Sequence, residues 1–508
     1  MTGLGLRVIT WWSARSSFTR RFLVNCLLGL TIELVLHASH HASWVQAVHQ
    51  ASMDWMMNMH RSVAFGKQAG NLPYVLIDID KKTYRSPQWG GGEPVQTPRD
   101  RLGDLITYAL QSGANYVVVD IALDGRLGVE EQALVERLAG LQASGTWNAN
   151  QHLLLVRTFQ DYSDDGMLLQ KMRPGIGELA PLALPNVHSV APLFLMSSDR
   201  ILREWLLWHV ACTSASEGAA SRWRIIPSVQ LQVLQLQRVG TGTAPWLEPK
   251  SLHLSQDSND ALSQACSGEP ADLQRQKQAL VELDHHLRSW FATLLQAGDG
   301  SHGETPAAKA SHGNDGLSSR IVFTLPWAGE VDTSVQVPRI KHPQRGDELP
   351  LLRIVPAALV INGQPPPFDL KGSLAVIGAS YEESHDLVFT PLGRMPGSLV
   401  LINATNSLLG NGVVHAPSPI TTWGVALALI MLISLVTAAI HSIVGVVLAL
   451  VVVLISLLPI SFYLFSIGLW LDFALPLIAV VLHRLIENLH ENYRALTHAK
   501  PQDSNANH

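Results

Sequence analysis

The sequence predicts an α/β domain with a partly parallel sheet outside a cell membrane, together with four transmembrane helices, one N-terminal and three C-terminal. Three observations predict this architecture. No Asp, Glu, Lys or Arg occurs between Arg394 and Asp472 in a chain of 508 residues. A second apolar segment follows a basic N-terminus. Between these regions, an apolar run, an amphipathic segment and another apolar run follow one another in the order of a βαβ unit.

Composition excludes several classes of protein. Charged residues make up 15% of the chain, against about 25% in an average soluble protein. A net charge of −5 and 47% hydrophobic residues fit neither a disordered chain nor a basic nucleic-acid binder. Three cysteines are too few for a disulfide scaffold. We therefore expect a folded protein that binds no nucleic acid.

The N-terminal anchor is expected at residues 22–42. Residues 1–21 carry arginines and no acid, and Phe22–Leu36 is mainly apolar. A cleaved signal peptide would show the same order, but Ala38–His40 makes a poor cleavage site. We therefore expect an uncleaved helix with residues 1–21 in the cytoplasm, because basic flanking residues stay inside.

The C-terminal membrane region is expected at residues 419–485. Ile420–Ile440 and Ile443–Ile467 are long enough to cross a bilayer, which takes about 20 helical residues. A third run, Leu469–Leu482, reaches that length only if it continues through His483 and Arg484. Residues 486–508 would then form a short tail on the cytoplasmic side, and residues 43–418 would lie outside.

Glu33 is the one acid within the first span. An acid inside a bilayer is costly and usually faces a partner. Either Glu33 lies mid-membrane against a polar group such as Ser461 or Thr437, or the helix sits lower and Glu33 nears the outer interface.

The outside region begins its α/β pattern at Tyr74–Asp80, a short apolar run that ends in acids and predicts a buried strand. Leu102–Leu110 follows with apolar residues on one helical face. Tyr116–Val119 is the second strand of this βαβ unit, so the sheet is at least partly parallel. Further strands are expected at Leu153–Val156, Ile321–Leu325 and Leu374–Ile377, and a further helix at Ser398–Leu409.

Residues 242–320 interrupt this pattern as an insertion. Asp272–Gln296 has apolar residues at helical spacing and predicts a helix. Ala297–Ser319 is rich in Gly, Ser, His and Ala and has little that could pack. We therefore expect the insertion to be partly disordered.

Three blocks of sequence carry a resemblance to a known family. The first comprises Val75–Asp78, Thr97–Arg99 and Gly113–Asp120. The second comprises Asn186–Val190, Asp199, Arg200, Arg203 and Ile226–Val229. The third and most specific comprises Leu374–Ser380, Asp386, Thr390–Pro391, Pro396–Gly397 and Asn403–Ala404. With these blocks in this order, the chain resembles the type-two CHASE sensor domain, the extracellular sensory domain associated with bacterial cyclases and histidine kinases.

The resemblance covers most of residues 60–485 and implies the same order of one span, an α/β domain and three spans. It implies a multi-pass protein of the bacterial inner membrane, with the large domain in the periplasm, both termini in the cytoplasm and homo-oligomers formed through helices. Many relatives carry a kinase or cyclase module after the last span. Only a short segment follows Arg484, so we expect no enzymatic output from this chain.

Candidate ligand-binding residues gather where predicted strands end. Asp78, Asp80 and Asp120 lie at such ends, and ligands of open parallel sheets bind there. The residues after the last strand that could join the same rim are Ser380, His385 and Asp386. Arg99, in the first turn of a helix, could recognise an anion. The competing interpretation is that the carboxylates cap helices and that Arg99 forms a structural ion pair.

Cys212 and Cys266 are both outside in this topology, where a disulfide can persist. Cys26 lies in the first span and cannot join them. A zinc site at His37, His40 and His41 is the alternative to a chance cluster, and we predict no metal and no cofactor. The sequence contains no Walker A, HExxH, GxGxxG or GxSxG pattern, so we predict no catalytic residues.

Two functions compete. The first is a sensory or regulatory membrane protein, whose periplasmic domain binds a signal or a partner and relays it through the membrane helices to a separate protein. The alternative is a scaffold or assembly subunit of an envelope complex for secretion or polysaccharide export. The ligand and the partner are not identified by the sequence.

Overall fold

The computed structural model describes residues 15–39, 41–62, 72–92, 97–123, 128–160, 169–173, 186–213, 222–239, 254–267, 272–296, 319–327, 339–341, 348–366, 368–415, 417–440, 443–466 and 468–498. The chain divides into two compact units. The helical unit comprises Met1–Met59 and His415–His508, and the α/β unit comprises His60–Val414.

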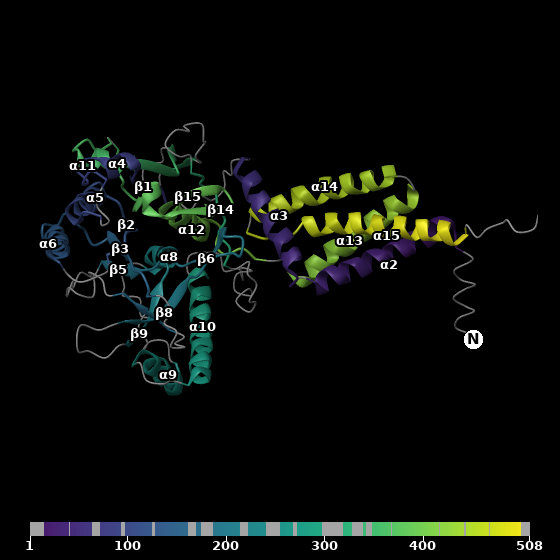
Figure 1. The fold of residues 1–508 in the computed structure, drawn as a ribbon, viewed down its shortest axis with the longest axis horizontal. Coiled ribbons are helices and arrows are strands. Elements are labelled where there is room, and N and C mark those ends of the chain that lie inside the picture. The colour runs from purple at the N-terminus through teal and green to yellow at the C-terminus, as the bar shows by residue number, and fades with distance from the viewer. Residues whose placement is uncertain are drawn as a thin grey trace, which may run out of the picture. The chain divides into compact units, whose positions relative to one another are not determined.

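A six-stranded sheet forms the centre of the α/β unit (Figure 1). Its strands, from edge to edge, are β12 (Leu352–Pro356), β1 (Tyr74–Ile79), β13 (Leu374–Ala379), β2 (Tyr116–Val119), β3 (His152–Val156) and β5 (Val187–Val190). All five pairings are parallel. The predicted α/β class and the partly parallel sheet are therefore confirmed. The strands are buried on both faces, as continuous apolar runs require.

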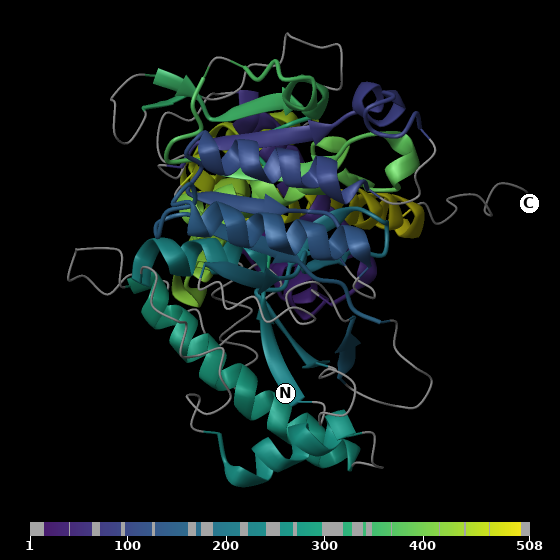
Figure 2. The same ribbon diagram turned by 90° about the vertical axis from the view of Figure 1, so that its left-hand side faces the viewer.

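Helices cover both faces of this sheet. One face packs against α5 (Arg99–Gln111) and α6 (Val129–Ala143), which lie across the front of the sheet in Figure 2. The other face packs against α12 (Gly397–Asn411), and α8 (Val229–Val239) packs on α12. Short helices α4 (Lys81–Arg85) and α11 (Ala357–Ile361) flank β1. Gly113 ends α5 with a φ of 91°, a conformation that favours glycine.

Smaller sheets extend the unit. One contains β4 (Gln170–Met172), β8 (Trp208–Thr213) and β9 (Arg222–Pro227). The two-stranded pairs are β6 (Phe194–Met196) with β7 (Leu202–Trp205), β10 (Arg339–Lys341) with β11 (Glu348–Pro350), and β14 (Leu387–Thr390) with β15 (Gly393–Pro396). The insertion contains the predicted helix as α10 (Leu273–Gln296), and also α9 (Gln256–Ser267), which the sequence analysis missed. The expected disorder at residues 297–318 lies outside the described residues.

The predicted strand Ile321–Leu325 is wrong. This segment is extended and buried but is not a strand. Only its first residue bonds to a strand among the described residues, because the amide of Ile321 donates to the carbonyl of Arg203 in β7 at 2.8 Å. Side chains of α12 satisfy its backbone instead: Asn403 Oδ1 accepts from the amides of Thr324 and Leu325 at 3.0 and 2.8 Å. Ser407 Oγ accepts from the amide of Val322 at 3.0 Å. The segment is apolar because it is buried, and so it resembles a strand in sequence. Its backbone amides bond to side chains of α12 and not to a neighbouring strand.

The helical unit contains three helices that are long and apolar enough to cross a membrane. They lie within α2 (Ser17–Ala38), α13 (Pro419–Ala439) and α14 (Ile443–Ser466). One N-terminal and two C-terminal spans are therefore supported. Ser16 and Ser418 cap α2 and α13, each accepting from an amide three residues on. The first helix ends at Ala38, before the predicted end at residue 42.

The fourth predicted span corresponds to α15 (Ala474–His498), which begins after the predicted start and continues through most of the predicted tail. Although α15 is 25 residues long, it is not among the helices whose hydropathy suits a membrane span, because charged residues follow Leu482. It packs against α2 and α14. The fourth crossing stays a prediction. Helix α3 (Ser43–Ser62), which was expected to begin the outside domain, groups up to Met59 with the helical unit.

Candidate functional site

The candidate site lies where three neighbouring strands of the main sheet end. Strand β13 runs between β1 and β2, and all three point the same way. Asp78 of β1 is in register with Gly378 of β13. The amide of Asp120, directly after β2, donates to the carbonyl of Ile377 at 2.9 Å. The sheet therefore brings residues that are far apart in sequence to one rim, as parallel pairing requires.

Asp78 and Ser380 meet on this rim. The Ser380 hydroxyl donates to Asp78 Oδ2 at 2.8 Å. Asp78 is 5% exposed, so its carboxylate needs such partners to be accommodated. This contact joins the end of β1 to the residue that follows β13.

The start of α12 lies against β13 with little room between them. A methyl group at Gly378 would overlap the Cβ of Ser398, and one at Gly397 would overlap the carboxylate of Asp386. The pair Gly397–Ser398 opens α12, and the amide of Gly397 donates to the backbone carbonyl of Asp386 at 2.8 Å. Glycine at both positions lets the helix N-terminus approach the end of the sheet closely.

Asp120 and Asp386 form a pair of interacting carboxyl groups beside this helix start. Burial raises the pKa of Asp120 well above its usual value, and the negative charge of Asp386 raises it further. Burial likewise raises the pKa of Asp386, to about 6, although the amides of Gly397 and Ser398 stabilise its carboxylate. Because burial and like charge both disfavour ionisation, the pair retains a proton to a higher pH than an ordinary carboxyl group does.

Ser398 completes the site and was missed by the sequence analysis. Its side chain is fully buried, and its hydroxyl has no hydrogen-bond partner among the described residues. Such an unpaired buried group is costly and marks a place where a partner would be accommodated. The available signal was the run Pro396–Ser398, in which small residues open an apolar helix directly after a hairpin.

The other predicted site residues have separate structural roles. Asp80 caps α4 by accepting from the amide of Thr83 at 2.7 Å. Arg99 donates through Nε to Glu131 at 3.1 Å, which ties α5 to α6. His385 is exposed and has a φ of 56°, at the end of a short 3-10 turn, Glu382–Ser384. Asp80 and Arg99 therefore have the cap and the ion pair that the competing interpretation gave them.

Cysteines and histidines complete the inventory of candidates. Cys212 of β8 and Cys266 of α9 form a disulfide, with Cα atoms 5.4 Å apart. His40 of the histidine cluster lies outside the described residues. Within the described part of the chain, no three His, Cys, Asp or Glu side chains gather as metal ligands would.

Comparison with known proteins gives one match. A family model described as the CHASE2 domain matches residues 27–440, which is most of the chain and confirms the resemblance seen in the sequence. The match includes the whole α/β unit and reaches through α13. No curated protein and no solved structure matches the chain.

Proposed function

We propose that this chain, which belongs to the CHASE2 family, is a bacterial inner-membrane sensor that reads its signal at the Asp120–Asp386 pair. CHASE2 domains are extracellular sensory domains, and three apolar helices fit a membrane protein. The periplasmic placement, the cytoplasmic termini and the relay to a separate protein belong to this proposal. So does a non-catalytic role, in which the chain binds a signal but transforms no substrate.

The course of α12 carries the proposal. Its first turn lies against Gly378 and beside the carboxyl pair, so protonation or a bound polar ligand acts directly on the helix start. Its last residue, Asn411, is joined to the span α13 through residues 412–418 alone. A shift of α12 along or about its axis therefore acts on a membrane helix through a short connection. Packed helices pass such shifts as small rigid-body movements.

The environment of α12 suits a rigid connector. Asn403 is fully buried, and its Nδ2 donates to the carbonyls of Leu325 and Leu399 at 2.8 and 3.0 Å. Thr405 is also buried and donates to the carbonyl of Leu401 at 2.8 Å. The bond from Asn403 to Leu325 connects α12 to the extended segment beside it, and the other two bonds lie within α12. The helix also packs against β13 and α8, so we expect a change at its start to move it as a unit.

Hydrogen–deuterium exchange on the full-length chain in lipid nanodiscs tests the relay. Asp386→Asn removes the charge at the helix start and imitates the protonated pair. We expect altered exchange at residues 397–400 and also at residues 412–418. Glu136→Gln on the exposed face of α6 is the control and should alter neither segment. A change confined to the first turn of α12 would show that the site is not connected to the membrane helices in this way.

A further inference from the structure

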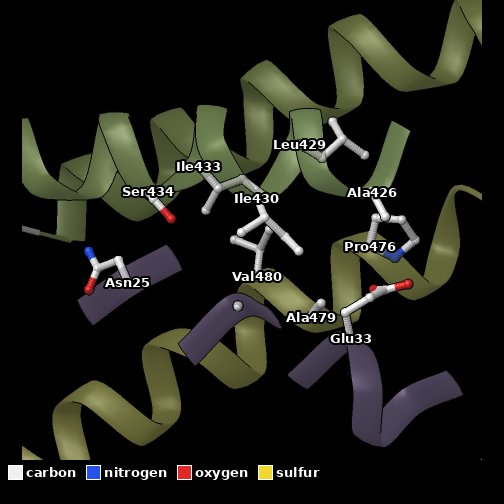
Figure 3. Close-up of a pocket in the computed structure, with 11 residues that line it drawn as sticks. Asn25, Glu33, Ala426, Leu429, Ile430, Ile433, Ser434, Pro476, Ala479 and Val480 are labelled. Atoms are coloured by element: carbon white, nitrogen blue, oxygen red, sulfur yellow. The ribbon is translucent and has the colours of Figure 1, made fainter. Parts of the chain in front are cut away.

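The helical unit contains an open-sided pocket between α2, α13 and α15. Figure 3 shows Glu33 at one end beside Pro476, and Asn25 and Ser434 at the other. The side chains between these ends are apolar, and include Ile430, Ile433 and Val480. Eight residues separate Asn25 from Glu33, so the pocket runs about 12 Å along α2.

The two ends of the pocket differ in their hydrogen bonding. Asn25 is 5% exposed, and its Nδ2 donates to Thr437 Oγ1 at 2.9 Å. Glu33 makes no hydrogen bond and no ion pair with any described residue. Thr437, suggested by the sequence as a partner of Glu33, is thus taken by Asn25. His37, one turn along α2, acts on Glu33 electrostatically. An acid within a membrane helix normally has a hydrogen-bond partner, and the carboxylate of Glu33 can accept a hydrogen bond from a ligand at this end of the pocket.

Glu33 lies close to the outer end of the span. It precedes the end of α2 at Ala38 by five residues, about 7.5 Å along the helix. One turn further out, the ring of His37 lies 5.3 Å from that of Trp423, a residue type enriched at membrane interfaces. Of the two depths open from the sequence, these two features favour the position near the interface. The headgroup of an outer-leaflet lipid can reach this depth.

The acid at this end, Glu33, suits a cationic ligand. Two groups act on Glu33 through their charge, first His37 of α2 and then Asp472, which adds a second negative charge. The carboxylate of Asp472 accepts from the amide of Ala474 at 2.8 Å and lies 3.0 Å from His49 Nδ1. The remaining lining of the pocket is aliphatic, which suits an alkyl chain and not a hydrated ion.

We propose that this pocket binds an amphiphile with a primary ammonium headgroup, namely an aminophospholipid of the surrounding membrane. The ammonium group donates hydrogen bonds to the carboxylate of Glu33. The upper part of an acyl chain lies along Ile430, Ile433 and Val480. The exposed side chains beside the pocket, such as Leu30 and Met431, are apolar, so the rest of the lipid continues onto lipid-facing helix surface.

The pocket also depends on close packing of the helices that form it. A methyl group added at Gly29 would lie 2.9 Å from Ile430 Cγ2, so α2 and α13 approach each other closely there. Ala479 of α15 lines the opposite wall. A bulky residue at position 479 would therefore occupy the pocket, whereas one on the lipid-facing side of α2 would not.

The test uses the full-length chain in a non-ionic maltoside detergent, with phosphatidylethanolamine, phosphatidylcholine or phosphatidylglycerol of identical acyl chains added. Thermal unfolding and native mass spectrometry are measured together. We expect phosphatidylethanolamine to raise Tm by several degrees and to be retained about tenfold more than phosphatidylglycerol, the gain of one charge-assisted hydrogen bond. Phosphatidylcholine, which has no N–H donor, should be retained less than phosphatidylethanolamine.

Three variants connect this preference to the pocket. Glu33→Gln should abolish the preference, and Ala479→Phe should abolish it by filling the space. Leu34→Phe is the matched control, because Leu34 is 64% exposed on the lipid-facing side of α2, and it should keep the wild-type preference. If Ala479→Phe folds poorly, the comparison of Glu33→Gln with Leu34→Phe still decides. Equal responses to the three lipids, or a preference that survives in Glu33→Gln, would overturn the proposal.

Discussion

Two acids at the carboxyl ends of strands, Asp78 of β1 and Asp120 after β2, show how much the surroundings of a single residue matter at the candidate site. Asp78 and Asp120 were both predicted from the sequence as strand-end acids, but they have different surroundings. Asp78 accepts a hydrogen bond from Ser380, whereas Asp120 faces the charge of Asp386. In the second arrangement the pKa of Asp386 is raised to about 6, within the range of environmental pH, which gives the rim a pH-dependent state.

The first prediction concerns the pH dependence of stability. The pKa of Asp386 is raised to about 6 in the folded chain, so its contribution is complete below about pH 4 and is lost as pH rises through 6. We expect the free energy of unfolding of the α/β unit to fall by about 2 kcal/mol between pH 4 and pH 8 on this account. Asp386→Asn should lose most of that dependence.

Denaturant unfolding of the full-length chain in detergent at a series of pH values measures this effect. Glu136→Gln, an exposed acid on α6, should retain the wild-type slope. If wild type and Asp386→Asn show the same slope between pH 5 and pH 7, the carboxyl pair does not share a proton as described.

The second prediction concerns the close approach of β13 and α12. Gly378→Ala should destabilise the α/β unit by about 2 kcal/mol, because the added methyl overlaps Ser398 and the helix start must move. Gly140→Ala provides the control, since nothing lies within 4 Å of the added carbon on α6. In that helix interior alanine should be neutral or stabilising. Thermal unfolding measures both variants. Equal Tm values for Gly378→Ala and Gly140→Ala would contradict the packing argument.

At the scale of elements, a disulfide fixes the position of the insertion on the rest of the α/β unit, a position that the sequence pattern does not predict. Helices α9 and α10 pack on each other, and α9 packs on β9. Trp223 Nε1 donates to Asn259 Oδ1 at 3.2 Å across that contact. The disulfide between β8 and α9 lies beside this hydrogen bond and holds the insertion on the three-stranded sheet of β4, β8 and β9.

The third prediction is that Cys212→Ser with Cys266→Ser destabilises the α/β unit by about 4 kcal/mol, because the bond closes a loop with a sequence separation of 54. Alkylation of the unfolded wild-type chain followed by mass spectrometry provides a direct measurement. Cys26 alone should be labelled without reductant, and all three cysteines after reduction. Three labels without reductant would show that the bond is absent from the protein.

At the scale of the whole molecule, the open question is the direction of α15. Pro476 lies beside Glu33 at one end of the pocket, and Asn25 lies at the other end (Figure 3). Arg484 follows Pro476 by eight positions, and Asn25 precedes Glu33 by eight positions, so in antiparallel helices Arg484 falls near the level of Asn25, about one turn from Arg21. Basic residues mark the cytoplasmic edge of a span. The similar level of the two arginines favours a crossing by α15 with its end on the same side as the start of α2.

The fourth prediction follows from this level. In a Cys26→Ser background, Thr497→Cys should resist a membrane-impermeant maleimide in intact spheroplasts, and Glu136→Cys should react. Both should react after detergent is added. Labelling of Thr497→Cys in intact spheroplasts would place the end of α15 outside and contradict a fourth crossing.

The sequence alone was sufficient for features that depend on local pattern. Charge-free runs identified the spans α13 and α14, since no other environment accepts so long an apolar surface. The strands β1, β2, β3 and β13 were found because buried parallel strands are short apolar runs between turns. The family could be identified from the order of motifs along the chain.

Tertiary structure decided everything that depends on which groups face each other. Ile321–Leu325 has the composition of a strand, but side chains of α12 take its hydrogen bonds. Arg99 and Asp386 both belonged to the predicted rim, yet one is bound by Glu131 and the other shares its environment with Asp120. Sequence fixes where apolar surface must be buried, because burial depends on local composition. The partner of each polar group depends on distances between segments far apart in the chain, which only the folded arrangement sets.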